Sequence, residues 1–206
     1  MIIYHHLGLG DHFMCYGLVR HFAEQETIQL LCKTHNLPTV QQMYSGHNIE
    51  LIPVAGDQEA NELLQNCSAI KRIGFTDTCN TGDFGKEFYR QAGIPYDTRW
   101  KYKINISPPK LIPGVKGKII IHDKNEFTIH VAGTRIHHIS GWTLLDWSYY
   151  VENAEKIYCI ESSVRQMIEF LNPKGVLYLY SHSGPKNIAS RHVWNTYANG
   201  SKRLFI

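Results

Sequence analysis

The 206-residue sequence predicts an α/β fold in which parallel strands are covered by helices on both faces. Short apolar runs typical of buried strands alternate with segments whose apolar residues recur at helical spacing. This alternation stops at residues 105–117, which are rich in proline and glycine, and then starts again. We therefore expect two α/β halves, residues 1–107 and residues 108–206.

In the first half, each expected strand is followed by a helix. Phe13, Tyr16 and Val19 share one helical face, Asp57 is a residue type that caps helices, and Gly93 precedes a proline, as is common after a helix. We expect strands at 2–4, 28–32, 49–54 and 69–75, and helices at 13–23, 35–44, 57–65 and 84–92.

The second half repeats the pattern with fewer helices. Thr143 and Asp146 have the spacing of a capping box, which predicts a helix start. The tail from Ser181 onward contains Gly-Pro and Asn-Gly pairs and is expected to be loop-rich. We expect strands at 118–121, 127–131, 156–160 and 175–180, and helices at 143–154 and 163–171.

Composition favours a folded protein of the cell interior. The hydrophobic fraction of 43% is sufficient for a core, and the net charge of +3 gives no reason to expect a nucleic-acid partner. Five widely separated cysteines argue against a disulfide framework and a cysteine zinc site. We see no signal peptide and no apolar run of the ~20 residues that a membrane span needs, so a cytoplasmic location is expected.

The first candidate site is the glycine-containing segment HHLGLGDHF, between the first strand and the first helix. Gly8 and Gly10 allow a ligand to approach the backbone closely, and the helix that follows offers its positive end to an anion. Phe13 stands where a dinucleotide-binding loop needs its third glycine, and the Gly-Lys-Ser/Thr of a Walker A loop is absent. The alternative is a tight turn in which Asp11 only caps the helix.

The second candidate site lies after a strand of the second half. Glu161 is followed by Ser162 and Ser163 at a helix start, where hydroxyl and N–H groups suit a phosphate or diphosphate, while Glu161 suits a sugar hydroxyl. Alternatively, one serine is simply the N-cap, with Gln166 completing a capping box.

A third polar cluster, His122-Asp123-Lys124, follows another strand of this half. It would face the same crevice as Ser162 if the two strands are neighbours. The alternative is a polar turn.

The histidines do not predict a metal site. The sequence has neither His-Glu-x-x-His nor Asp-x-Asp, and the adjacent His5 and His6 are expected to point to opposite sides of a strand. It also has no Gly-x-Ser-x-Gly nucleophile elbow.

Three stretches resemble segments of GT-B-type glycosyltransferase-like proteins of bacteria and phages, the heptosyltransferase-type members included: HHLGLGDHFMCYGLVRHFA, AEKIYCIESSVRQMIEFL followed by GVLYLY, and AGIPYDTRW. The resemblance implies two Rossmann-like halves facing a cleft, in a reduced GT-B-like architecture. The first half would bind the acceptor and the second the nucleotide-sugar. The chain is much shorter than a full GT-B enzyme, so each half would be pared down.

The resemblance also implies a role for individual residues. Asp11 matches the acid that takes a proton from the acceptor hydroxyl. The residues implied in substrate binding are Gly8, Gly10 and His12 in the first half and His122, Asp123, Arg135, Glu161, Ser162 and Ser163 in the second. Among these, Ser162 and Ser163 match the phosphate-binding helix start, and Arg135 is a cation suited to a diphosphate.

The function expected from these residues is metal-independent transfer of a sugar from a nucleotide-sugar to a hydroxyl acceptor. No cofactor is needed besides the donor substrate. Two alternatives remain open: a non-catalytic nucleotide- or sugar-binding module of the same fold, and a nucleotide-sugar epimerase.

Overall fold

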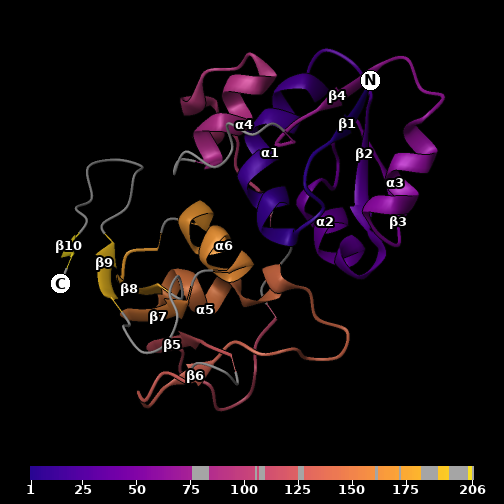
Figure 1. Cartoon of the computed structure of the whole chain (residues 1–206). Helices are drawn as coiled ribbons and strands as arrows, with labels where there is room; N and C mark the ends of the chain where they lie inside the picture. Colours follow the sequence, from indigo (N-terminus) through magenta and orange to yellow (C-terminus); the bar gives the residue numbers. More distant parts are fainter. Residues whose placement is uncertain are drawn as a thin grey trace. The chain divides into compact units, whose positions relative to one another are not determined.

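The computed structural model of the chain describes residues 1–75, 84–104, 106, 110–124, 128–160, 162–171, 173–181, 190–194 and 204–205. The chain divides into two compact units, residues 1–105 and 106–206. Each unit has its own sheet with four parallel strands and helices packed on it, which confirms the predicted α/β class (Figure 1).

The first unit contains a four-stranded parallel sheet in the order β3-β2-β1-β4. The chain runs outward from β1 to β3 and then returns to place β4 on the other side of β1. The strand order therefore reverses between β1 and β4, and ligands of such sheets bind at that point, beyond the carboxyl ends of the strands. The strands are β1 (Ile2–Tyr4), β2 (Ile28–Lys33), β3 (Ile49–Val54) and β4 (Ile70–Arg72).

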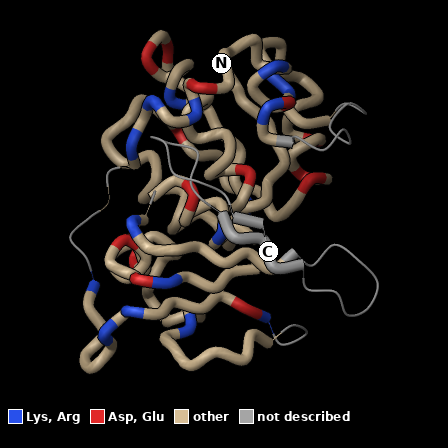
Figure 2. Tube along the Cα trace, turned by 90° about the vertical axis from the view of Figure 1, so that its left-hand side faces the viewer, with Lys and Arg blue, Asp and Glu red and all other residues tan. Residues whose placement is uncertain are grey.

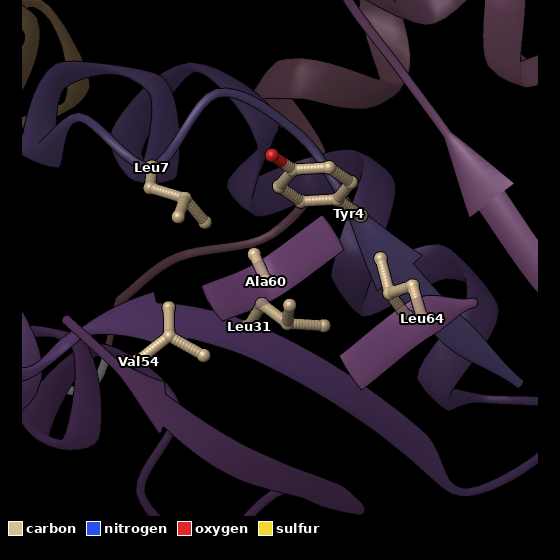
Figure 3. Packing of buried hydrophobic residues seen from close by; sticks show 6 residues of the cluster. All are labelled: Tyr4, Leu7, Leu31, Val54, Ala60 and Leu64. Atoms are coloured by element: carbon tan, nitrogen blue, oxygen red, sulfur yellow. The ribbon is translucent and has the colours of Figure 1, made fainter. Parts of the chain in front are cut away.

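Helices cover both faces of this first sheet, with α3 on one side and α1 and α2 on the other (Figure 1). Figure 3 shows the core under α3, where Ala60 and Leu64 of the helix meet Tyr4, Leu31 and Val54 of the strands. The helices are α1 (Leu9–Ala23), α2 (Leu37–Met43), α3 (Asp57–Leu64) and α4 (Phe84–Ala92), with 3-10 turns η1 (Thr34–Asn36) and η3 (Tyr96–Trp100).

The second unit contains a six-stranded sheet in the order β10-β9-β8-β7-β5-β6. The strands β8, β7, β5 and β6 are parallel, and β9 and β10 are antiparallel. Here the order reverses at β5, which lies between β6 and β7. The strands are β5 (Ile119–His122), β6 (Thr134–Arg135), β7 (Lys156–Ile160), β8 (Val176–Ser181), β9 (Ser190–Trp194) and β10 (Leu204–Phe205).

The helices of the second unit are η4 (Leu144–Trp147), α5 (Ser148–Asn153) and α6 (Ser163–Leu171). The predicted capping box of Thr143 and Asp146 is confirmed at the start of η4. Asp146 accepts a hydrogen bond from the Thr143 N–H at 2.6 Å, and it also pairs with Lys110 at 2.9 Å.

The first helix begins at Leu9, four residues before the predicted start at Phe13. Gly8 has an extended backbone, and its carbonyl oxygen accepts the N–H groups of Asp11 and His12 at 3.0 and 3.2 Å. The glycine segment is therefore the N-cap and the first turn of the helix. Helical apolar spacing starts only at Phe13, which is why the pattern placed the boundary too late.

The strand predicted over residues 127–131 is wrong for its described part, residues 128–131. The Ile129 N–H donates to the Asp123 carboxylate at 2.9 Å, so this N–H is bound by a side chain instead of a sheet neighbour. The strand that pairs with β5 on the side away from β7 is instead β6, at Thr134–Arg135. The tail also contains strands β9 and β10 where only loops were expected.

No helix in the described part of the chain combines the length and apolarity needed to cross a membrane. Basic and acidic residues are interspersed along the described trace (Figure 2).

Candidate functional site

The side chains of His5 and His6, which follow β1, point in different directions, as predicted. The His5 ring is buried and packs edge-on against the His12 ring of α1, with ring centroids 4.5 Å apart. The His6 ring lies elsewhere: its Nε2 is 2.6 Å from the Gly74 carbonyl oxygen, and its ring stacks on Phe75 at 4.7 Å. His6 thus joins the ends of β1 and β4 at the point where the strand order reverses.

Asp11 is the third residue of α1 and reaches back over the helix start. Its carboxylate lies close to the backbone N–H groups of Gly8 and of Asp11 itself, which lower the pKa of the carboxyl. A Cβ atom at position 8 would lie 2.5 Å from Asp11 Oδ2, so a larger residue there would push the carboxylate aside. The chain's own acid therefore lies at the helix start, where a phosphate would otherwise bind.

Burial raises the pKa of the Asp11 carboxyl to about 6. The charges of His6 and Lys33 and the nearby backbone N–H groups act in the opposite direction, but their effects are smaller. A carboxylate with such a pKa is ionised near neutral pH and is still basic enough to accept a proton in catalysis.

His5 and His12 form a polar pair inside the first unit, each with 0% of its side chain exposed. The His5 Nδ1 contacts the His6 carbonyl oxygen, whereas His5 Nε2 and both ring nitrogens of His12 have no hydrogen-bond partner among the described residues. Burial lowers the pKa of His5 to about 4 and lowers the pKa of His12 as well. Both rings are therefore neutral near pH 7, and His12, expected among the substrate-binding residues, lies in the interior.

In the second unit, two of the predicted polar segments follow neighbouring strands. β5 and β7 pair in parallel, with His122 in register with Cys159. Because the two strands are neighbours, His122, Asp123 and Ser162 lie at the same edge of the sheet, as predicted for that case. Glu161, the predicted acid of this edge, lies outside the described residues.

The Arg135 guanidinium is bound to groups of its own unit. Its Nε lies 3.3 Å from Asp123 Oδ2, and its second nitrogen donates to the Ile129 carbonyl oxygen at 2.8 Å. Asp123 also accepts the Ile129 N–H. Arg135 and Asp123 thus both bind the backbone of Ile129.

Ser162 caps α6. Its hydroxyl oxygen accepts the Arg165 N–H at 3.4 Å and donates to the Ile160 carbonyl oxygen at 3.3 Å. Ser163 is the first residue of the helix. Ser162 is therefore an N-cap, as the alternative predicted, but the third residue of the helix is Arg165, so Gln166 does not stand at the capping-box position of this cap.

His122 Nδ1 is buried and has no hydrogen-bond partner within the described ranges. Burial lowers the pKa of this imidazole, and the nearby Asp123 opposes the shift. His122 is therefore a neutral imidazole beside the Ser162 helix start. Across the residues that the structure describes, no three or more His, Cys, Asp or Glu side chains are grouped to hold a metal ion.

Sequence reasoning missed a cluster at the reversal point of the first sheet. Phe75 packs on Tyr4 and His6, and the Tyr4 hydroxyl donates to Asp57, which pairs with Lys33. The Gly-Phe pair at the end of β4 was the available signal, because a glycine at a strand end allows an unusual turn. Its meaning depends on β4 pairing with β1, which the sequence alone does not show.

No protein family, no curated protein and no solved structure matches this chain. The fold and the described residues define an α/β protein in which polar side chains collect where the strand order of each sheet reverses.

Proposed function

We propose that this protein is a glycosyltransferase that moves a sugar from a nucleotide-sugar to a hydroxyl acceptor without a metal. In the reduced GT-B-like arrangement implied by the resemblance, the first unit would bind the acceptor and the second unit the donor. Asp11 would take the proton of the acceptor hydroxyl as the acceptor oxygen attacks the anomeric carbon of the donor sugar. The nucleoside diphosphate would leave with the bonding electron pair.

The observation that carries this proposal is the environment of Asp11. The carboxylate lies against the backbone of Gly8 at the helix start that follows β1, and burial raises its pKa to about 6. A general base needs a fixed position and a pKa near the working pH, and Asp11 has both.

In the second unit, the α6 start and His122 support a role in donor binding. Backbone N–H groups at a helix start attract the phosphates of a leaving group. The neutral imidazole of His122, the last residue of the neighbouring strand β5, is a hydrogen-bond partner suited to the same ligand.

The replacement Asp11→Asn tests the proposal. It removes the base but keeps the size of the side chain, so we expect turnover to fall at least about 100-fold, which is the usual minimum contribution of a general base. Donor affinity, measured by calorimetry with nucleotide-sugars, should stay within about twofold because the donor is assigned to the other unit.

The matched control is Glu62→Gln, an exposed acid of α3 in the same unit, which should leave turnover unchanged. Equal loss of donor binding and of turnover in Asp11→Asn would contradict the base role. Unchanged turnover would also contradict it.

A non-catalytic binding module is the second candidate, and one observation favours it. The Ser162 hydroxyl and the Arg135 guanidinium are both engaged within the protein. Thermal shifts with nucleoside diphosphates and nucleotide-sugars, followed by product analysis, separate the two candidates. Binding without any transfer or epimerisation would favour the module.

A further inference from the structure

Phe75 is an exposed aromatic residue at the reversal point of the first sheet. It follows β4, and 42% of its side chain is exposed. An exposed phenylalanine contributes little to the core. The contacts that hold Phe75 in place therefore need an explanation other than core packing.

The backbone of Gly74, next to Phe75, makes contacts through both its N–H group and its carbonyl oxygen. The Gly74 N–H donates to the Gln91 side-chain oxygen at 2.7 Å, and the Gly74 carbonyl oxygen lies 2.6 Å from His6 Nε2. Gly74 has a φ of +92°, and a Cβ atom there would lie 2.8 Å from His6 Cδ2 and closer still to the Phe88 ring. Glycine is therefore required, and the turn that it makes aims Phe75 at β1.

The Phe75 ring rests on two rings of the β1 segment. Its centroid lies 4.6 Å from that of Tyr4 and 4.7 Å from that of His6, with interplanar angles of 35° and 29°. Tyr4 and His6 are two residues apart on an extended segment, so their side chains project to the same side. The Phe75 ring packs on this pair, and part of its surface remains exposed.

Polar groups border the ring cluster. The Tyr4 hydroxyl, at the edge of the ring that touches Phe75, donates to Asp57 Oδ1 at 3.2 Å. Lys33 Nζ lies 3.5 Å from Asp57 Oδ2, and both side chains are partly exposed to solvent. The Lys33 charge is balanced by Asp57, and the Asp11 carboxylate lies at the α1 start, so this edge does not favour an anion.

We infer that Phe75 is the stacking platform of a binding site for a neutral, hydroxyl-rich ring, namely a pyranose. The C–H face of the sugar would lie on the Phe75 ring, and its hydroxyl groups would donate to Asp57 and accept from Lys33. This inference rests on the proposed function in one respect: the sugar would be part of the acceptor.

The test uses the whole chain and methyl pyranosides, with binding measured by saturation-transfer NMR and titration. Phe75→Leu keeps an apolar side chain without the ring, and we expect it to weaken pyranoside binding about tenfold, the order of magnitude of one aromatic contact. Phe75→Trp keeps an aromatic face and should retain binding. Its indole fluorescence should change when the pyranoside is added.

The matched control is Leu63→Ala on α3, which removes a side chain of similar exposure (40%) from the same unit. It should bind pyranosides like the wild type. Equal affinity of Phe75→Leu and the wild type would overturn the inference, as would binding of adenosine or uridine at this site in place of pyranosides. Circular dichroism of each variant separates lost binding from lost folding.

Failure of this inference is distinguishable from failure of the proposed function. Pyranoside binding that depends on Phe75, in a protein that transfers no sugar, would keep the site and reject the glycosyltransferase. Sugar transfer that is lost in Asp11→Asn but unchanged in Phe75→Leu would keep the enzyme and reject the site.

Discussion

Asp11 and His5 respond to acid in opposite directions. The folded-state pKa of His5, about 4, lies below its ordinary value of 6.5, so the unfolded chain binds more protons between these values and stability falls as the pH drops through them. The folded-state pKa of Asp11, about 6, lies above its ordinary value of 3.8, so the folded protein binds more protons and stability rises as the pH drops. Between about pH 4 and 6 the two effects offset each other.

Asp11→Asn removes the contribution of Asp11 to the pH dependence of stability and leaves that of His5. An asparagine does not titrate, so the variant should gain stability relative to the wild type as the pH rises from about 4 to about 7. The expected gain is about 3 kcal/mol, because the pKa shift is about two units at about 1.4 kcal/mol each. Urea unfolding at four pH values in this range measures the difference.

The exposed Glu62→Gln variant provides the reference, and its stability should run parallel to that of the wild type over the same range. A difference between Asp11→Asn and the wild type that stayed constant with pH would show that Asp11 titrates normally in the folded protein.

Gly17 determines how α1 packs on the segment that follows α4. It lies inside the helix, and a Cβ atom there would be 2.5 Å from the Thr98 carbonyl oxygen and 2.7 Å from Arg99 Cα of η3. Backbone atoms cannot move aside as the end of a flexible side chain can. The helix and the 3-10 turn therefore approach as closely as two backbones allow.

Gly17→Ala should destabilise the protein by about 2 kcal/mol, because the overpacking exceeds the gain of about 1 kcal/mol in helix propensity. Gly85→Ala is the control within α4, since its nearest neighbours are side-chain atoms at 3.3 Å and 3.4 Å. Chemical denaturation of both variants makes the comparison. A Gly17→Ala variant as stable as the Gly85→Ala variant would mean that α1 and η3 can separate without cost.

Elements with a strong local signal were predictable from the sequence. The bounds predicted for β7, α6 and α4 agree with the structure, because each has clear apolar spacing between polar or glycine residues. The strand β6 was missed because it has only two residues, and the side chain of Asp123 replaces the neighbouring strand for Ile129. Apolar spacing contains no information on which side chain will bind a particular backbone N–H.

The same distinction applies to the candidate site. Asp11, His122 and Ser162 were predictable as site candidates because each lies in or near the segment where an apolar strand leads into a loop or helix, and such segments of α/β proteins bind ligands. The Phe75 cluster was not predictable, since it depends on β4 returning to pair with β1. The buried His5–His12 pair likewise depends on how α1 packs on β1.

At the scale of the whole molecule, each unit is built as a separate folding unit. In the first unit, the core under α3 is formed only by residues of that unit, and its four strands pair with one another. In the second unit, the cluster of Ile121, Ile129 and Ile160 is likewise internal. About 100 residues with a complete sheet and their own core are enough for a domain to fold alone.

We therefore expect residues 1–105, expressed alone, to fold into a monomer that unfolds cooperatively. Its sheet order and the core under α3 need no strand or side chain from residues 106–206 among those described. Gly17→Ala should destabilise this fragment by the same amount, about 2 kcal/mol, as it does the full chain, because the α1–η3 contact lies within the fragment. Far-UV circular dichroism during urea unfolding gives both quantities, and a fragment without a cooperative transition would show that the first unit folds only with the second.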